Sequence, residues 1–244
     1  MFKANTNNNA DNTEKGWFKF EREGRDFPFY KHNPHIGIVK WILLFIAPWI
    51  ALIFAPPIPY VEGIIRLSIM LIIFGFIAEG KFGLIFKKFQ KGDLKLIVIV
   101  VILGIFFALA MSMLVDFLGF VGHGNPVYEE LDSLYFWFSF PFDIMIEEFL
   151  KLGPFLAILT LFYQKTKMRR LSIIVATIVT LAFFGLLHTD SVGNVIVALT
   201  VIGIPSVLDV YAYIKTKNIV VTYLTHILFD IALFSISAIF SLIS

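Results

Sequence analysis

The stretch Ile144-Met-Ile-Glu147-Glu148-Phe-Leu-Lys151-Leu152 decides how the rest of the chain is interpreted. It places two adjacent carboxylates and a lysine inside a run of mostly apolar residues that extends from Leu134 to Tyr163. Ionisable groups are costly in the hydrocarbon of a membrane, so they are rare there and usually functional. We therefore expect this segment to be a membrane helix that carries a chemical site.

The composition of the whole chain supports a membrane location. The 244 residues are 58% hydrophobic and only 16% charged, with a mean hydropathy of +0.84, whereas about a quarter of the residues of a soluble domain are charged. There is no cysteine, which excludes disulfides, cysteine-ligated zinc and a thiol nucleophile. The basic residues form short clusters rather than a stripe with stacking aromatics, so nucleic acid is not an expected partner.

Seven apolar runs predict an all-α, polytopic bundle of about seven transmembrane helices. Each run is near the ~20 residues that a helix needs to cross about 30 Å of hydrocarbon. The runs are Ile36–Ala55, Gly63–Ile77, Leu94–Phe117, Leu134–Tyr163, Leu171–Leu187, Val192–Tyr213 and Ile219–Ile243. An eighth span fits only if residues 82–89 are re-entrant. The predicted domains are a cytoplasmic, polar and interfacial segment at 1–35 and a membrane domain at 36–244, with the site-bearing core at about 134–237.

The positions of Lys and Arg predict the orientation. Of the 20 such residues, 17 lie in the N-terminal segment or in alternate loops, and the remaining loops carry only acidic charges. By the positive-inside rule the N-terminus is cytoplasmic. This predicts a multi-pass protein of a prokaryotic cell membrane, in contact with the lipid bilayer. The sequence carries no signal for the oligomeric state.

Two segments outside the spans have alternative interpretations. Residues 17–35 mix aromatic and basic side chains, a composition that suits the lipid headgroup layer. We favour an interfacial collar here over a docking arm. In the loop at 119–133, His123 is either a metal ligand or, more simply, a solvated loop residue. The acidic side chains of that loop are either a solvated patch or a recognition site for a basic substrate; they are Glu129, Glu130 and Asp132.

The depth of the polar residues suggests that they meet. Glu147 lies 18 residues before Lys165, and His188 lies 18 residues after Arg170. Because the two spans form a hairpin around this basic loop, both side chains should lie about 27 Å from it. His226, nine residues after Lys217, should lie only about 14 Å along its own span. Helix tilt, or a helix break at Gly153-Pro154, would have to close that difference.

Helical spacing places the candidate residues on shared faces. His226 and Asp230 are separated by four residues, as are Phe184 and His188, so each pair shares one side of its helix. Polar groups in membrane helices face the interior of the bundle or a wet cavity. The simplest arrangement is one cavity that is lined by Glu147, Glu148, His188, His226 and Asp230.

Such a cavity is suited to amide hydrolysis. A carboxylate in a low dielectric can accept a proton from water, and imidazoles can orient the water, bind zinc or donate to an oxyanion. Two histidines and one carboxylate are also a known catalytic zinc set, here Glu147, His188 and His226. The alternative without chemistry is a buried ion pair between Lys151 and a neighbouring glutamate, with a packing contact between His226 and Asp230. The spacing does not choose among these roles.

Three motifs resemble those of a known family. Glu147-Glu148, then Phe184-Gly-Leu-Leu-His188, then His226-Ile-Leu-Phe-Asp230 look like the signature of the CAAX-protease and bacteriocin-processing (CPBP, or Abi) intramembrane proteases. That signature is Glu-Glu-x-x-x-Arg, Phe-x-x-x-His and His-x-x-x-Asn/Asp, and the resemblance covers about residues 135–237. It implies that Glu147 and His188 activate water, that His226 and Asp230 stabilise the oxyanion, and that Glu148 is an accessory carboxylate. The substrate would be a peptide or a membrane protein.

The first motif departs from the family pattern. Leu152 stands at the arginine position and Lys151 one residue earlier, a Glu-Glu-x-x-Lys spacing that is closer to the PrsW-type proteases. Lysine cannot form the bidentate contacts of arginine. We therefore also consider a catalytically inactive membrane scaffold, such as a bacteriocin-immunity or signalling regulator. A proton- or ion-coupled transporter is a third hypothesis, although no internal repeat supports it.

Overall fold

A computed structural model of the chain describes residues 20–31, 36–122, 127 and 130–243, with the side chains given as far as residue 237. In the described part, all regular structure is helical. The long helices are α2 (Ile38–Phe54), α3 (Glu62–Ile77), α4 (Asp93–Phe117), α5 (Leu134–Thr166), α6 (Arg169–Leu187), α9 (Val207–Thr216) and α10 (Ile219–Ile243). The short ones are η1 (Phe82–Leu84), α7 (Thr189–Val192), α8 (Val195–Val197) and the π-helical turn η3 (Ala198–Gly203). The predicted polytopic helical bundle is thereby confirmed as a fold class.

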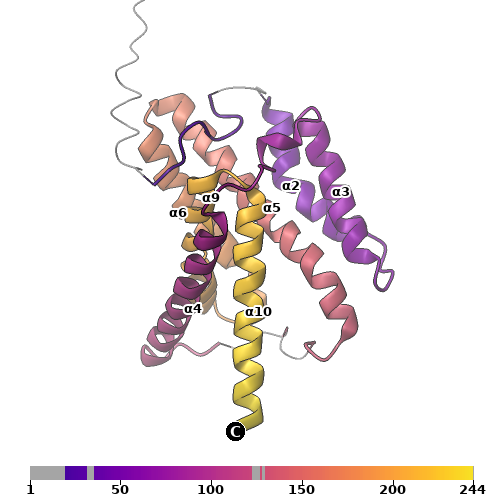
Figure 1. Ribbon diagram of the computed structural model, residues 1–244, viewed down its shortest axis with the longest axis vertical. Helices are drawn as coiled ribbons and strands as arrows, with labels where there is room; N and C mark the ends of the chain where they lie inside the picture. The colour runs from indigo at the N-terminus through magenta and orange to yellow at the C-terminus, as the bar shows by residue number, and fades with distance from the viewer. Residues whose placement is uncertain (1–19, 32–35, 123–126, 128–129, 244) are drawn as a thin grey trace, which may run out of the picture.

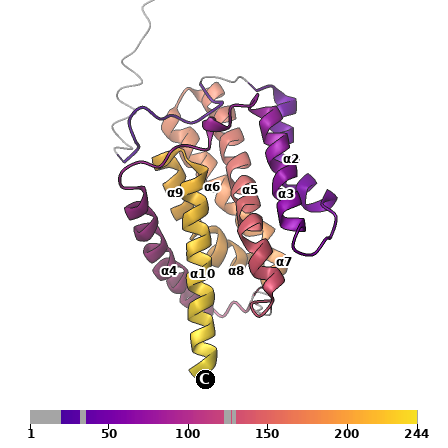
Figure 2. The same cartoon turned by 45° about the vertical axis from the view of Figure 1, so that its right-hand side comes forward.

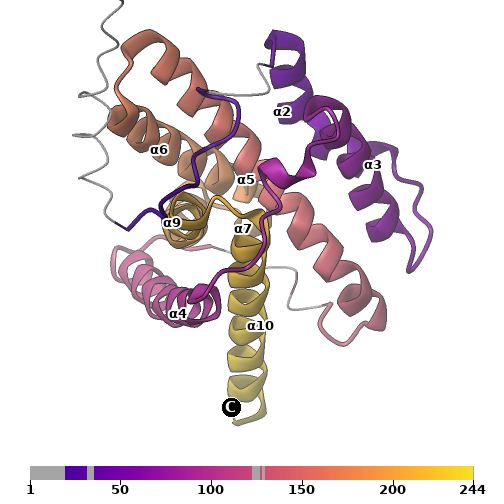
Figure 3. The ribbon, with the colours of Figure 1, turned by 45° about the horizontal axis from the view of Figure 1, so that its top comes forward.

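Helix α5 crosses the middle of the bundle. It packs against α2 and α3 on one side and against α6 and α10 on the other, as Figure 3 shows. Its 33 residues continue through both Pro141 and Pro154, so the helix break considered at Gly153-Pro154 is absent. At 1.5 Å per residue α5 is about 50 Å long, which exceeds the hydrocarbon thickness of a membrane. It must therefore run obliquely or extend beyond the lipid.

Four helical stretches are long and apolar enough to cross a membrane among the residues described. They are Asp93–Phe117, Arg169–Leu187, Val195–Thr216 and Ile219–Ser237. Helix α2 is also apolar but has only 17 residues. Large apolar side chains along α4 are exposed, including Phe106, Met113 and Phe117, as expected for a helix that faces lipid. The count of seven spans and the cytoplasmic N-terminus stay predictions.

The predicted span at Val192–Tyr213 is not one regular helix. Its residues form the end of α7, then α8, η3 and α9. Gly193 has a left-handed backbone (φ 67°) that ends α7, and the side chain of Asn194 caps the next turn by accepting from the Ile196 amide at 2.9 Å. The segment at 82–89, where an eighth span would fit only as a re-entrant one, contains a single helical turn of three residues, η1.

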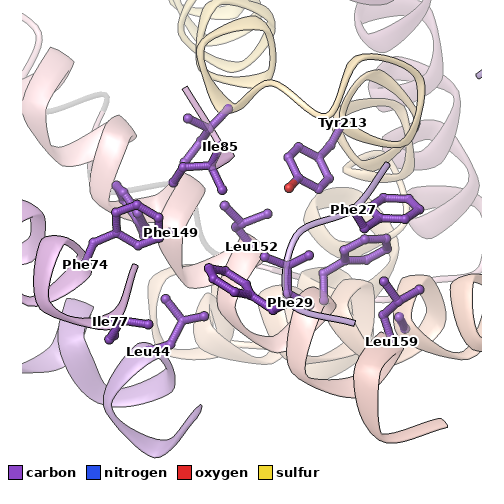
Figure 4. Packing of buried hydrophobic residues seen from close by; sticks show 14 of the residues in the cluster. Phe27, Phe29, Leu44, Phe74, Ile77, Ile85, Phe149, Leu152, Leu159 and Tyr213 are labelled. Atoms are coloured by element: carbon purple, nitrogen blue, oxygen red, sulfur yellow. The ribbon is translucent and has the colours of Figure 1, made fainter. Parts of the chain in front are cut away.

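The main core joins segments that are far apart in the sequence. Phe27 and Phe29 pack with residues of α2, α3, α5 and α9 in one apolar cluster, part of which Figure 4 shows. The sequence interpretation put these aromatics in the lipid headgroup layer, but both rings are at most 4% exposed. Residues 20–31, which we call the N-terminal strap, are therefore part of the packed fold. Trp17, Phe18, His123 and Glu129 lie outside the described residues.

Candidate active site

Helix α5 buries an ion pair at the level of the first motif. The carboxylate of Glu148 lies 2.5 Å from the ammonium of Lys151, one turn later, and both side chains are about 95% buried. The ammonium also lies 3.0 Å from Asp209 of α9. Leu152, which stands at the family's arginine position, is instead part of the apolar core. The lysine thus reaches a polar cluster from a neighbouring face of the helix.

His226 on α10 joins this cluster. Its Nδ1 lies 2.9 Å from the same oxygen of Glu148 that contacts Lys151. Because an ionised carboxylate only accepts hydrogen bonds, Nδ1 carries a proton and donates it. The other ring nitrogen, Nε2, lies 3.5 Å from Asp230 and 3.8 Å from Glu147. The predicted shared face of His226 and Asp230 is therefore confirmed, and Glu148 fixes the orientation of the ring.

His188 follows the last residue of α6. Its Nδ1 lies 2.8 Å from the backbone carbonyl of Phe184, and since a carbonyl only accepts, this nitrogen also carries a proton. In the neutral ring the free lone pair is then on Nε2. The ring of Phe184 packs against both His188 and His226, with centroid distances of 4.7 and 6.2 Å. Phe184 therefore spaces the two imidazoles.

The expected difference in depth between His226 and the pair Glu147 and His188 has a structural cause. The turn between α9 and α10 lies lower in the bundle than the turn between α5 and α6 in both Figure 1 and Figure 2. Lys217 in this turn is fully buried and pairs with Glu21 of the N-terminal strap. The depth argument treated Lys217 as a marker of the membrane surface. Because the strap covers Lys217 and its turn lies nearer the middle of the bundle than the α5–α6 turn, His226 reaches α5 without a break in that helix.

One large cavity connects most of these residues. It has a volume of about 790 Å³ and is lined by parts of α3 to α10. Four of the five predicted catalytic residues line it, namely Glu147, His188, His226 and Asp230. Glu148 instead lines a second, small cavity behind them. The Glu147 side chain is 31% exposed and that of Glu148 only 3%, so the two adjacent carboxylates have different surroundings.

The family comparison covers this region of the chain. Residues 124–232, which include all three motifs, match the family described as type II CAAX prenyl endopeptidase Rce1-like. This segment is therefore similar to the Rce1-like proteins. The resemblance to the CAAX proteases is thereby confirmed, and together with the apolar helices it supports a multi-pass membrane protein. The PrsW-like spacing of the first motif stays a prediction. No curated protein and no solved structure matches the chain.

The Rce1-like segment contains one group with the spacing of a metal site among the described residues. It consists of Glu148, Asp209 and His226, whose ligand atoms lie within 4.8 Å of one another. The structure does not gather the predicted zinc set of Glu147, His188 and His226 in this way. The centre of the trio is taken by the Lys151 ammonium, which lies 2.5 to 3.2 Å from one atom of each member.

Sequence reasoning missed Asp209. It is the only charged residue in the predicted span at Val192–Tyr213, and the rule that singled out Glu147 applies to it equally. A second missed feature is a polar cluster on the wall of the large cavity. There Arg66 of α3 contacts Glu62 and lies 3.1 Å from Asp143, while the Tyr135 hydroxyl donates to Glu62 at 2.7 Å. Arg66 also lies inside a predicted span, so the same rule would have found it.

Proposed function

We propose that the protein hydrolyses a peptide bond in a membrane-associated protein or a peptide precursor, in a prokaryotic cell membrane. The observation that carries this proposal is the placement of Glu147, His188, His226 and Asp230 on the wall of one large cavity inside the helical bundle. The Rce1-like match supports the reaction class. The working unit is the membrane domain, with the site-bearing core at about 134–237.

Glu147 is the residue best suited to activate water. Its side chain is exposed to the cavity, and its neighbour Glu148 already takes the charge of Lys151. Glu147 removes a proton from water, and the hydroxide that results attacks the carbonyl carbon of the scissile amide. His188 holds the water through Nε2, because its Nδ1 proton is engaged with Phe184.

The second histidine serves the oxyanion. Nδ1 of His226 donates to Glu148, so a further proton on Nε2 would make that nitrogen a donor on the cavity wall. Asp230 lies 3.5 Å from Nε2 and orients this proton. A preformed donor where negative charge develops lowers the barrier to attack. When the tetrahedral intermediate collapses, Glu147 gives its proton to the amide nitrogen, the carbon–nitrogen bond breaks and the amine leaves.

The chemistry of the donor set does not require a resident metal in this scheme. Zinc is held by ligands at about 2.0–2.2 Å, and Glu147 and His188 are not among the three-ligand groups of the described residues. No step above therefore passes through a metal. Addition of a chelator is expected to leave cleavage unchanged.

The proposal is tested with purified protein in proteoliposomes. Two probes are offered, a farnesylated peptide with a CAAX terminus and a membrane-anchored peptide precursor, and the products are identified by mass spectrometry. Cleavage of either probe should be lost in Glu147→Gln and in His188→Ala. Glu23→Gln is the matched control, because Glu23 is exposed on the N-terminal strap. Full cleavage by Glu147→Gln would contradict the proposal and favour the scaffold alternative.

A further inference from the structure

The ammonium of Lys151 lies among three side chains that have the spacing of a metal site. Glu148, Asp209 and His226 come from three different helices, α5, α9 and α10. The ammonium of Lys151 lies 2.5 Å from the first, 3.0 Å from the second and 3.2 Å from Nδ1 of the third. Two carboxylates and an imidazole around one positive centre are the ligand types that divalent transition metals prefer.

The surroundings of the ammonium hold it in this position. The Lys151 side chain is 5% exposed, and its Nζ lies 4.9 Å from the centroid of the Phe184 ring, a cation–π contact. Asp209 is itself anchored, because its second oxygen accepts a hydrogen bond from Thr225 at 3.0 Å. Thr225 directly precedes His226 on α10. Asp209 therefore links the lysine of α5 to the helix that carries the histidine.

A small cavity lies directly behind the cluster. It has a volume of about 20 Å³ and is lined by Glu148, Lys151 and Asp209 together with apolar residues and Tyr213. The Tyr213 side chain is 4% exposed, and its hydroxyl has no hydrogen-bond partner among the described residues. Figure 4 shows this oxygen directed toward Leu152, which also lines the cavity. The space is enough for about one water molecule.

We propose that Lys151 is the resident cation of the site, in the place that a metal ion would take, and that Asp209 is its positioning residue. The ammonium balances the negative charges of Glu148 and Asp209, so that Glu148 remains a carboxylate that accepts a hydrogen bond from Nδ1 of His226. The catalytic role of this cluster rests on the proposed function. The position of the Lys151 ammonium among Glu148, Asp209 and His226 does not. Removal of the ammonium should therefore leave an open three-ligand site for a divalent ion, which would bind as Nδ1 of His226 releases its proton to solvent.

The first test is a metal titration that needs no enzymatic activity. Purified Lys151→Ala and Lys151→Ser are titrated with Zn²⁺ by equilibrium dialysis, and with Co²⁺ by visible absorption. We expect one equivalent bound at least about tenfold tighter than by the unchanged protein, and loss of that gain in Lys151→Ala/Asp209→Asn. Lys81→Ala is the control, because Lys81 is exposed at a loop. Circular dichroism and size-exclusion profiles select the variants that remain folded.

Two outcomes would overturn the occupation of the site by lysine. One is equal affinity of the unchanged protein and both folded lysine variants for the two metals. The other is a gain in affinity that survives the Asp209→Asn change. Neither outcome depends on whether Glu147 activates water, so this test can fail while the proposed function holds, and the reverse is also true.

The second test concerns Asp209 as a positioning residue. Asp209→Asn should lower kcat about 10- to 100-fold with little change in KM, because it disturbs the histidine rather than substrate contacts. Asp209→Glu, which keeps the charge, should recover part of the rate. The pH profile of kcat should also shift in Asp209→Asn, which a purely structural contact would not cause. An Asp209→Asn protein with unchanged kcat and pH profile would rule out this role.

Discussion

Two largely buried charge clusters in this molecule are similar in content and different in setting. The first, in the middle of the bundle, consists of Glu148, Lys151, Asp209 and His226. The second ties the N-terminal strap to the ends of the helices and consists of Glu21, Asp26, Arg169 and Lys217. Each balances carboxylates against cations within the protein. Buried charge by itself therefore does not mark a catalytic site.

The strap cluster is closed by aromatic rings. Both carboxylate oxygens of Glu21 accept from Arg169, at 2.6 and 2.7 Å, and the same carboxylate pairs with Lys217. The ring of Phe27 covers both cations, with the guanidinium carbon at 5.3 Å and the ammonium at 4.5 Å from its centroid. Neither of the two cavities described above is lined by strap residues. This cluster has the geometry of a structural clamp.

The titration of the strap cluster fits that role. Burial opposes the charged form of Glu21, but the hydrogen bonds from Arg169 and the charge of Lys217 outweigh burial and lower the pKa of Glu21. Burial also lowers the pKa of Lys217 to about 8, in spite of the neighbouring Glu21. The carboxylate is thus held charged by its partners, as in a clamp whose contacts persist at neutral pH.

The middle cluster differs because two further carboxylates border it on a cavity wall. Glu147 and Asp230 line the large cavity and approach only Nε2 of His226, at 3.8 and 3.5 Å. The inner members hold the ring, while these outer members face the space where a substrate would lie. The comparison teaches that a cavity beside the charges, rather than their burial, distinguishes a chemical site from a clamp.

The most direct test of this difference is to neutralise one glutamate beside the middle cluster and one in the strap cluster. Glu147→Gln should lower the cleavage rate by about 10²–10⁴-fold, because it removes the proposed general base. Its free energy of unfolding should change by less than about 1 kcal/mol, since the side chain is 31% exposed and its contact with Nε2 of His226 is long, at 3.8 Å. Glu21→Gln should instead lower the free energy of unfolding and leave the cleavage rate nearly unchanged. Cleavage assays and thermal melts in detergent measure both quantities.

A second change should combine the two effects. Glu148→Gln removes the charge that faces Lys151 and weakens the acceptor for His226. Breaking a buried ion pair costs about 3–5 kcal/mol, and the loss of ring orientation should lower kcat about 10-fold or more. Asp132→Asn is a control on an exposed acidic side chain. If Glu148→Gln lost activity with unchanged stability, Glu148 would belong to the cavity wall and not to the supporting cluster.

The strap cluster predicts a dependence of stability on pH. Because the pKa of Glu21 is lowered in the folded protein, its contribution is present above its ordinary pKa of 4.5 and is lost as the pH falls through the lowered value. Glu21→Gln should therefore lower the free energy of unfolding by about 2–4 kcal/mol at pH 7. The difference from the unchanged protein should shrink below about pH 4. Thermal melts from pH 3 to pH 8, with Glu23→Gln as the control, test the sign; a difference that grows on acidification would contradict it.

The sequence predicts most helix bounds because apolar run length is a local property. The run at Leu94–Phe117 becomes a helix at Asp93–Phe117, and the run at Ile219–Ile243 coincides with α10. The irregular segment before α9 also contains turn-forming residues, Gly193-Asn194 and Pro205. A hydropathy average over the whole span does not register them. These errors could be corrected from the sequence by weighing turn chemistry against hydropathy.

The remaining errors come from contacts that no local pattern contains. Lys217 was taken as a surface marker, but its partner Glu21 lies 196 positions earlier in the chain. Phe27 and Phe29 were assigned to the headgroup layer because their composition suits it, while their burial depends on the α5 and α9 surfaces. Whether Glu147 or Glu148 pairs with Lys151 depends on how α5 is rotated about its own axis, and this rotation is set by the packing of α5 against its neighbours. The motifs select the candidate residues, and tertiary packing determines which of them line the cavity.

The smallest expected effect tests how rigidly the second motif is held. Gly203 of η3 packs on α6, where an added Cβ would lie 2.8 Å from the Leu181 carbonyl oxygen and 3.3 Å from the Cα of Gly185. Both neighbours are backbone atoms and cannot rotate away, so Gly203→Ala must separate η3 from α6. Such overpacking costs about 1–3 kcal/mol. Because His188 directly follows the last residue of α6, the rate should fall only a few-fold as the imidazole shifts. Gly83→Ala, where an added Cβ has no neighbour within 4 Å, is the matched control; equal melting temperatures and rates for the two variants would show that this packing does not position His188.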